Sequence, residues 1–230
     1  MKVAILTGSS KGIGLSIVKR LISLNYKVYG LSRSKDSTYS HDRFIPVQCD
    51  LLNTDELTKA VTSIIDCAPQ IDLLINNAGV GYFGTHEQIS VKDIQTMIRT
   101  NLEAPLVLCR LLLRPLKNSR GTILSISSVT AKKVSTHGCA YAATKAGLSH
   151  FLTSLFEEVR KSGIKITTIH PDITKSNFYD SLDFTYEDVE GAVILADQVA
   201  DAVEYVLSNN QNIVVSDITL RPQINRIKRK

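Results

Sequence analysis

Short runs of β-branched and other apolar residues alternate along the chain with longer stretches in which apolar residues recur every three or four positions. Short apolar runs are typical of buried strands, and the longer spacing is typical of amphipathic helices. The short runs predict strands at residues 3–6, 27–31, 44–48, 73–75, 122–126, 165–169 and 212–216. The longer stretches predict helices at 14–23, 54–65, 141–161 and 196–208, and a pair of helices within 91–116.

This alternation indicates βαβ units, in which a helix connects each strand to the next parallel one. Seven such strands predict an α/β fold with a doubly wound parallel seven-stranded sheet and helices on both faces. We expect a single domain over residues 1–225 of the 230. The stretch at about 172–193 lacks regular spacing and mixes acidic with aromatic residues, so we expect it to form a lid over a binding site.

The composition is that of an ordinary globular protein, with 43% hydrophobic and 21% charged residues. The formal charge is +5, but four basic side chains lie in the tail 226–230, and without them 23 basic residues face 22 acidic ones. We therefore expect a solvated, frayed tail and no nucleic-acid partner, because nucleic-acid binding proteins gather their basic residues on one face of the fold. Nucleic-acid binding through the tail stays as an alternative, which predicts an affinity that falls with salt.

The four cysteines are far apart and form no C-x-x-C pair; they are Cys49, Cys67, Cys109 and Cys139. We expect reduced thiols, no disulfide framework and no metal site. The first apolar run, at residues 3–6, is too short for a signal peptide, and no stretch has the length of a membrane span. We therefore expect a cytoplasmic protein with no membrane partner.

A glycine-rich loop follows the first strand and leads into the first helix, with the sequence Thr7-Gly8-Ser9-Ser10-Lys11-Gly12-Ile13-Gly14. Glycines let a backbone turn tightly and approach a pyrophosphate, and a helix N-terminus offers free N–H groups. The spacing G-x-x-x-G-x-G differs from the usual dinucleotide fingerprint G-x-G-x-x-G. The loop by itself could be a plain turn, but its place between strand and helix favours a phosphate site.

The end of the second strand, where a dinucleotide fold reads the ribose, carries Ser32-Arg33 and no acid. An acidic residue there would repel a 2′-phosphate, whereas Arg33 and Lys11 offer that phosphate two cations. The pair therefore favours NADP(H) over NAD(H). The competing interpretation is that both are ordinary surface cations.

Tyr141 and Lys145 are four residues apart in a predicted helix, which places phenol and ammonium on one face. An adjacent ammonium stabilises the phenolate and lowers the pKa of a tyrosine, so that the phenol can act as an acid or base. Ser128 follows the fifth strand and can orient a substrate oxygen. Alone, Y-x-x-x-K is a common pattern on exposed helices.

Taken together and in this order, these motifs resemble the short-chain dehydrogenase/reductase family over roughly the first 180 residues. The likeness also includes Asp50 after the third strand, Asn76-Asn77-Ala78-Gly79 after the fourth, and Asn101. It implies a Rossmann-like fold, Tyr141 as general acid or base, Lys145 as the group that lowers its pKa and binds the nicotinamide ribose, and Ser128 as the residue that stabilises the substrate oxygen. Asn101 would complete a proton relay through a backbone-held water.

The residues expected to contact the cofactor NADP(H) are Gly8, Ser10, Lys11, Gly12, Ile13, Gly14, Arg33, Asp50, Leu51, Asn77, Ala78, Gly79, Tyr141, Lys145, Pro171, Ile173 and Ser176. The expected reaction is hydride transfer between this cofactor and a small carbonyl or alcohol, and the aromatic residues of the segment 172–193 favour a hydrophobic one. The alternative is an NADP(H)-binding sensor or scaffold that turns over poorly. The resemblance also implies a homodimer or homotetramer.

The sequence departs from the family pattern after the sixth strand, where Asp172 replaces a glycine and Ser176 takes the place of a threonine. We expect Asp172 to turn outward as a cap for the segment 172–193, with its charge either solvated or paired by Lys175. His86, His137 and His170 are expected in loops near the cleft and receive no catalytic role, since Tyr141 and Lys145 already supply the proton chemistry. Tyr82 and Phe83 are expected to form a pocket wall, and the competing interpretation is that they are exposed aromatic residues of a loop.

Overall fold

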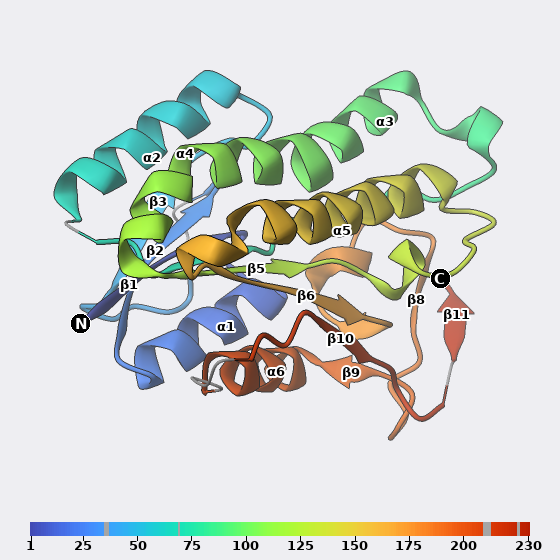
Figure 1. Cartoon of the computed structure of the whole chain (residues 1–230). Helices are drawn as coiled ribbons and strands as arrows, with labels where there is room; N and C mark the ends of the chain where they lie inside the picture. Colours follow the sequence, from blue (N-terminus) through green and yellow to red (C-terminus); the bar gives the residue numbers. More distant parts are fainter. Residues whose placement is uncertain (35–36, 69, 209–212, 225) are drawn as a thin grey trace.

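A parallel sheet of seven strands lies at the centre of the computed structural model, which describes residues 1–34, 37–68, 70–208, 213–224 and 226–230 (Figure 1). In sheet order the strands are β3 (Phe44–Gln48), β2 (Tyr26–Ser32), β1 (Lys2–Thr7), β4 (Leu73–Asn76), β5 (Thr122–Ile126), β6 (Lys165–Pro171) and β10 (Asp217–Leu220). The chain builds outward from β1 to β3 and then returns to β4 beside β1. The order therefore reverses between β1 and β4, where open α/β sheets bind their ligands.

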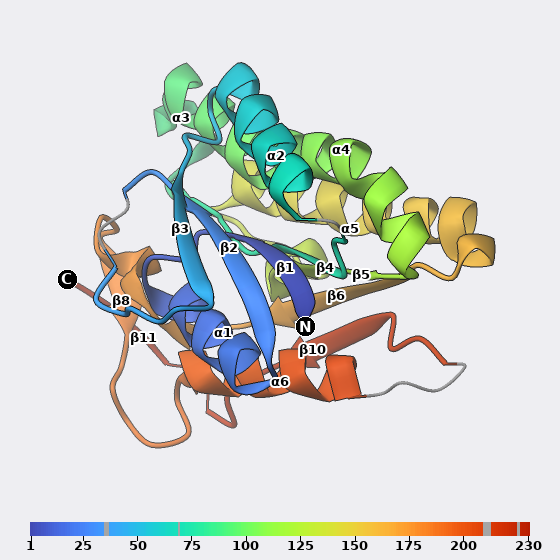
Figure 2. The ribbon, with the colours of Figure 1, turned by 90° about the vertical axis from the view of Figure 1, so that its left-hand side faces the viewer.

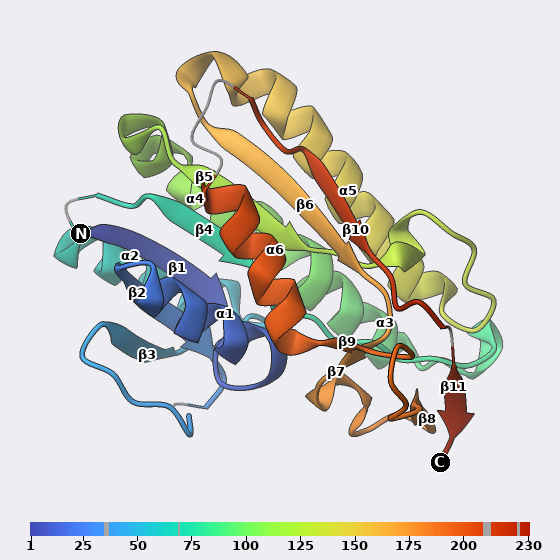
Figure 3. The same ribbon diagram turned by 90° about the horizontal axis from the view of Figure 1, so that it is seen from below.

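Helices cover both faces of the sheet (Figures 1 and 2). The helices α2 (Thr54–Cys67), α4 (Ala104–Ser119) and α5 (Cys139–Val159) pack on one face. The helices α1 (Gly12–Ser23) and α6 (Ala196–Ser208) lie side by side on the other, as Figure 3 shows. This confirms the predicted α/β fold class.

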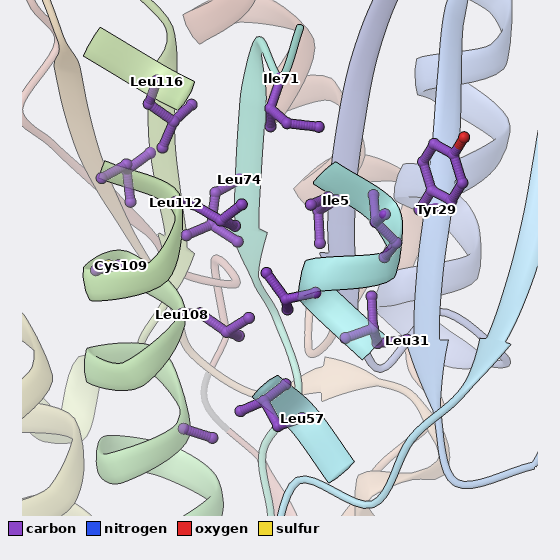
Figure 4. Packing of buried hydrophobic residues seen from close by; sticks show 14 of the residues in the cluster. Ile5, Tyr29, Leu31, Leu57, Ile71, Leu74, Leu108, Cys109, Leu112 and Leu116 are labelled. Atoms are coloured by element: carbon purple, nitrogen blue, oxygen red, sulfur yellow. The ribbon is translucent and has the colours of Figure 1, made fainter. Parts of the chain in front are cut away.

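Close-packed aliphatic side chains hold the α2–α4–α5 layer to the sheet (Figure 4). Ile5, Leu31 and Leu74 project from three neighbouring strands, and Leu57 of α2 and Leu112 of α4 pack against them, all at most 1% exposed. Burial of such a side chain stabilises the fold by roughly 1.5–3 kcal/mol. The carboxyl ends of these strands are therefore held firmly, and the loops that follow them start from fixed positions.

The first six strands and the helices begin and end within three residues of the predicted positions. The predicted pair within 91–116 consists of α3 (Val91–Ile98) and α4, joined by a π-helical turn at Arg99–Glu103. Within the described ranges, no helix is both long and apolar enough to cross a membrane.

The seventh strand was predicted in the wrong place. Of the range 212–216, Asn212 lies outside the described residues, and 213–216 form no strand; β10 follows at Asp217–Leu220. The prediction rested on the apolar residues of this range, but Ile213 is 60% exposed. The residues that pair with β6, from Thr168 onward, are 217–220. Pairing with β6, and not hydrophobicity, therefore sets the start of β10, which is an edge strand of the sheet.

The segment 172–193, named the lid from here on, is more regular than predicted. It contains β7 (Thr174–Lys175), a 3-10 helix (Asn177–Tyr179) and β8 (Phe184–Tyr186). The strand β7 pairs in parallel with β9 (Ile194–Leu195), which follows the lid and leads into α6.

The prediction of a frayed tail is wrong. Residues Ile227–Arg229 form β11, which pairs antiparallel with β8 of the lid (Figure 3). The Lys230 ammonium donates to the backbone carbonyls of Tyr179 and Asp180. Backbone pairing with the lid therefore holds a segment whose charges alone suggested solvation.

Candidate active site

One cavity of about 1280 Å³ opens at the carboxyl ends of β1, β4, β5 and β6. It brings together every residue predicted for cofactor binding or catalysis except Asn101. The lining includes Gly8, Ser10, Lys11, Gly12, Ile13, Gly14, Arg33, Asp50, Leu51, Asn77, Ala78, Gly79, Ser128, Tyr141, Lys145, Pro171, Ile173 and Ser176. Residues from seven separate segments of the sequence thus meet at the point where the strand order reverses.

The glycine loop needs its glycines. Gly8 and Gly12 have φ angles of +71° and +57°, which L side chains rarely adopt. A Cβ on Gly14 would lie 1.9 Å from the Gly8 carbonyl oxygen, so any side chain there would collide with the loop. The helix α1 starts at Gly12, and Lys11 at its N-cap makes no side-chain cap hydrogen bond. Its first N–H groups are therefore suited to bind an anionic phosphate, and the residues fit a dinucleotide.

Thr7, to which the sequence analysis assigned no role, joins the glycine loop to the segment after β4. Its hydroxyl oxygen accepts hydrogen bonds from the backbone N–H groups of Asn77 and Ala78, at 3.1 and 3.0 Å. The Asn77 side-chain amide donates to the carbonyls of Thr7 and Gly8, at 2.9 and 3.1 Å. The ends of β1 and β4 are therefore linked on the floor of the cavity. The T-G pair at the end of the first strand was the available signal.

Lys11 and Arg33 are exposed and both line the cavity. The Lys11 ammonium is 3.9 Å from the Asp180 carboxylate of the lid, with both side chains about two-thirds exposed. An ion pair with this exposure contributes little to stability, so Lys11 can exchange Asp180 for another anion. Two exposed cations thus line the cavity, as the sequence predicted.

Tyr141 and Lys145 are buried on the side of α5 that faces the sheet, at 7% and 3% exposure. The Lys145 ammonium donates to the carbonyl of Ile126, the last residue of β5, at 3.0 Å. It lies 5.8 Å from the centre of the Tyr141 ring. The four-residue spacing thus places both groups in the cavity, as predicted.

Burial shifts the pKa of both groups in the direction that favours the uncharged form. It raises the pKa of Tyr141 above its ordinary value, and a hydrogen bond with Ser128 only partly opposes this. Burial is the largest cause of the Tyr141 shift, and the expected effect of Lys145 on the pKa of Tyr141 stays a prediction. Burial also lowers the pKa of Lys145 to about 8.

Asn101 does not line the cavity but stands directly behind it. It lies in the π-helical turn and is fully buried. Its side-chain oxygen accepts from the Val80 N–H at 2.9 Å, and its amide donates to the Val80 carbonyl at 2.8 Å and to the Thr144 hydroxyl at 3.1 Å. The side chain therefore ties the segment after β4 to α5. Thr144 shares this contact and was not singled out from the sequence.

Asp172 is paired, but not by the residue expected. Its carboxylate is 3.4 Å from the Lys133 ammonium, while Lys175 binds Asp188 at 2.6 Å. The other carboxylate oxygen accepts from the Ile173 N–H at 3.0 Å. With a side chain only 11% exposed, Asp172 does not turn outward. The charge beside the cavity is compensated from the segment after β5.

Aromatic rings enclose the end of the cavity next to Tyr141. The rings of Phe83 and Phe178 lie 5.3 and 5.7 Å from the Tyr141 ring, and Phe184 of β8 lies 5.2 Å from Phe83. Phe83 and Tyr82 line the cavity, as predicted. Ile227 and Arg229 of β11 also line it, so the C-terminal strand contributes to a wall that the sequence did not indicate.

The three histidines differ in position. His86 lies in a short 3-10 helix and His137 in a loop that lines the cavity. His170 lies inside β6, and not in a loop as predicted. Within the described residues, no group of three or more His, Cys, Asp or Glu side chains is placed to hold a metal ion.

Known proteins share this fold and sequence pattern. The chain is 28% identical to serine 3-dehydrogenase from Agrobacterium fabrum, over 95% of this chain and 92% of that protein. An alcohol dehydrogenase from the archaeon Thermococcus sibiricus, solved with 5-hydroxy-NADP, superposes with a TM-score of 0.88 at 22% identity, and covers 98% of both chains. A 3-ketoacyl-(acyl-carrier-protein) reductase from Brucella melitensis, solved with NADH, has a TM-score of 0.85 at 21% identity, over 97% of this chain and 98% of that one.

The family model described as short chain dehydrogenase matches residues 2–186, which span the glycine loop, the Ser128, Tyr141 and Lys145 cluster and most of the lid. The chain therefore belongs to the short-chain dehydrogenase family of oxidoreductases.

Proposed function

We propose that this chain reduces a small carbonyl compound, or oxidises the corresponding alcohol, with NADP(H). The observation that carries the proposal is the meeting of Ser128, Tyr141 and Lys145 in the same cavity as the glycine loop. A protein that only binds a dinucleotide has no need of a buried phenol, ammonium and hydroxyl at the other end of that cavity.

The preference for NADP(H) rests on Lys11 and Arg33. Both are exposed on the cavity rim, near the ends of β1 and β2, where a 2′-phosphate would lie. Solved structures of the same fold contain an NADP derivative in one case and NADH in another, so the fold alone accommodates either. The two cations are what favours the phosphorylated form here.

When bound, the nicotinamide supplies or accepts a hydride. Tyr141 and Ser128 both line the cavity, where their hydroxyls can reach one substrate oxygen. Ser128 donates a hydrogen bond that orients this oxygen and stabilises its growing negative charge. Tyr141 delivers the proton that converts the alkoxide into an alcohol, and takes it back in the reverse direction. A raised pKa suits Tyr141 to be protonated before reduction.

Lys145 and Asn101 support the phenol. The Lys145 ammonium, fixed by the Ile126 carbonyl, stabilises the phenolate that forms when Tyr141 gives up its proton. Asn101 holds the segment after β4 against α5, and so fixes the distance between the two walls of the site. We propose that its backbone also takes part in the relay that returns a proton to Tyr141.

The substrate end favours a hydrophobic compound. Phe83, Phe178 and Phe184 surround the approach to Tyr141, and their edges and faces offer an apolar surface. We therefore propose diketones, quinones and keto esters as the first compounds to test.

The test is the oxidation of NADPH, followed by its absorbance, with a panel of these carbonyl compounds. Turnover is expected for the wild-type chain, and Tyr141→Phe should abolish it while NADPH binding, measured by fluorescence, stays within about twofold. Turnover that survives in Tyr141→Phe would contradict the assigned role. Tight NADPH binding with no turnover on any compound would favour a sensor or scaffold.

A further inference from the structure

His170 is a fully buried, titratable side chain that the proposed mechanism does not use. It lies near the end of β6, and both of its ring nitrogens face oxygen atoms. Nδ1 is 3.1 Å from the backbone carbonyl oxygen of Ser128, and Nε2 is 2.7 Å from a carboxylate oxygen of Asp217, the first residue of β10. A ring buried only to fill space would not need two such partners.

The second partner is itself held in place. Lys132, from the segment after β5, binds the other carboxylate oxygen of Asp217 and donates to the Thr219 hydroxyl at 3.1 Å. Burial lowers the pKa of His170, while the Ser128 carbonyl and Asp217 oppose this shift and Lys132 adds to it. One chain of contacts thus runs from the surface to the backbone of Ser128, through Lys132, Asp217 and His170.

The contact with Ser128 occurs where β5 leaves the sheet. The Ser127 N–H still donates to the Ile169 carbonyl of β6, at 2.8 Å. The next residue, Ser128, has an extended backbone, and its carbonyl accepts from the Ala131 N–H at 3.0 Å as well as from the His170 ring. The Thr130 N–H donates to its hydroxyl at 3.2 Å, so the ring is the contact that reaches Ser128 from the neighbouring strand. That carbonyl belongs to the residue that lines the cavity together with Tyr141. The ring therefore adds a contact from β6 to the local turn contacts that place the Ser128 hydroxyl.

We propose that His170 is a positioning residue for Ser128, itself held by Asp217. The inference rests on the proposed function, because it concerns how that site aligns its hydroxyl with the substrate oxygen. A displacement of about 1 Å in a reacting group can lower a rate about 100-fold. Loss of the contact between His170 and Ser128 is therefore expected to lower the rate of the reaction.

The first experiment compares two substitutions of His170. His170→Leu removes the donor, and we expect kcat to fall by about 10- to 100-fold while the Kd for NADPH changes less than twofold. His170→Asn places an amide N–H near the position of Nδ1, and kcat should return to within about threefold of wild type. An unchanged kcat in His170→Leu, or an equal loss in both variants, would overturn the proposal.

The second experiment asks whether His170 acts through Ser128. In a Ser128→Ala background no hydroxyl remains to be positioned, so His170→Leu should lower the residual turnover by less than about twofold. A purely structural role predicts the same loss in both backgrounds, and that additive result would contradict the inference.

Two controls keep the outcome interpretable. Thermal unfolding and NADPH binding report whether each variant is folded, and if His170→Leu is not, Asp217→Ala replaces it, because that side chain is 42% exposed. Asp217→Ala should lower kcat in the same selective way, and an unchanged kcat would overturn the proposal. A wild-type chain with no turnover refutes the proposed function, whereas an active wild type with a fully active His170→Leu refutes this inference alone.

Discussion

At the scale of single residues, Lys145 shows that the active-site arrangement opposes stability. Its ammonium is buried, which lowers its pKa to about 8 from an ordinary value of 10.5. Between these two pH values the unfolded chain binds more protons than the folded one, so the free energy of unfolding rises with pH in this window. At neutral pH the buried Lys145 charge therefore lowers the free energy of unfolding by about 3 kcal/mol.

We predict that Lys145→Met stabilises the protein at pH 7 and removes its activity. The gain should be about 2 kcal/mol, because the lost hydrogen bond to the Ile126 carbonyl offsets part of the buried-charge cost. At pH 10.5 most of this gain should disappear, since the wild-type amine is then neutral in the fold. Urea denaturation at both pH values measures the difference, and a gain that is equal at both would contradict the buried-charge explanation.

Arg33 gives a prediction about cofactor choice. Arg33→Asp replaces a cation that faces the proposed 2′-phosphate with a carboxylate that repels it. The ratio of kcat/KM for NADPH over NADH should fall by about 10- to 100-fold, mainly through NADPH, as expected for the loss of a charged contact of 1.5–3 kcal/mol. Lys59→Asp, an exposed change on α2 outside the cavity, is the matched control. An unchanged ratio in Arg33→Asp would refute the assignment.

The sequence indicated some site residues and not others for a physical reason. Tyr141 and Lys145 are four residues apart on one helix, so their meeting is a local property of helical geometry. His170 and Ser128 are 42 residues apart, and only the pairing of β5 with β6 brings them together. A residue whose role depends on a partner from another strand carries no local signal.

At the scale of elements, the glycine loop and α1 form a unit that tolerates no side chain at Gly14. Gly14→Ala would normally favour a helix, but the new Cβ would lie 1.9 Å from the Gly8 carbonyl oxygen. We predict a loss of about 1–3 kcal/mol in the free energy of unfolding and a weaker affinity for NADPH. Thermal unfolding and fluorescence titration measure the two effects.

Gly147→Ala in α5 is the matched comparison. Its Cβ would meet the Leu102 side chain at 3.4 Å, an ordinary contact, so the substitution should leave NADPH affinity unchanged and stabilise the helix by up to about 1 kcal/mol. Equal effects of the two substitutions would show that the close approach at Gly14 is not what constrains the loop.

The position of most elements followed from hydrophobic spacing, but two features did not. The π-helical turn at Arg99–Glu103 inserts one extra residue into the helical repeat, and an apolar pattern read over several turns does not resolve it. The start of β10 depends on its register with β6, where Thr168 pairs with Asp217. The register of an edge strand depends on its contacts with the neighbouring strand. The apolar residues in the range 212–216 therefore did not indicate that the strand starts at Asp217.

At the scale of the whole molecule, the C-terminal strand links the two ends of the site. The strand β11 pairs with β8, Lys230 binds the carbonyls of Tyr179 and Asp180, and Asp180 contacts Lys11 beside the glycine loop. The basic side chains of the tail predicted that it is solvated. That prediction failed because a pattern of charges carries no information about backbone pairing with a distant strand. The lid is thus held from both sides of the cavity.

Deletion of residues 226–230 should therefore loosen the lid. Each backbone hydrogen bond lost with β11 contributes about 1 kcal/mol, so chymotrypsin should cleave within 178–186 at least about 10-fold faster. The KM for the carbonyl substrate should rise, because Ile227 and Arg229 line the cavity, while kcat changes little with Ser128, Tyr141 and Lys145 in place.

The double substitution Arg226→Gln with Lys228→Gln separates backbone pairing from charge. It keeps the strand and removes two exposed cations, one of them only 3.7 Å from Glu187 in an exposed pair of small energy. Its cleavage rate and KM should therefore match those of the wild type. If the tail instead binds nucleic acid, both variants should lose a salt-sensitive affinity, and the lid should be cleaved at the wild-type rate even in the deletion.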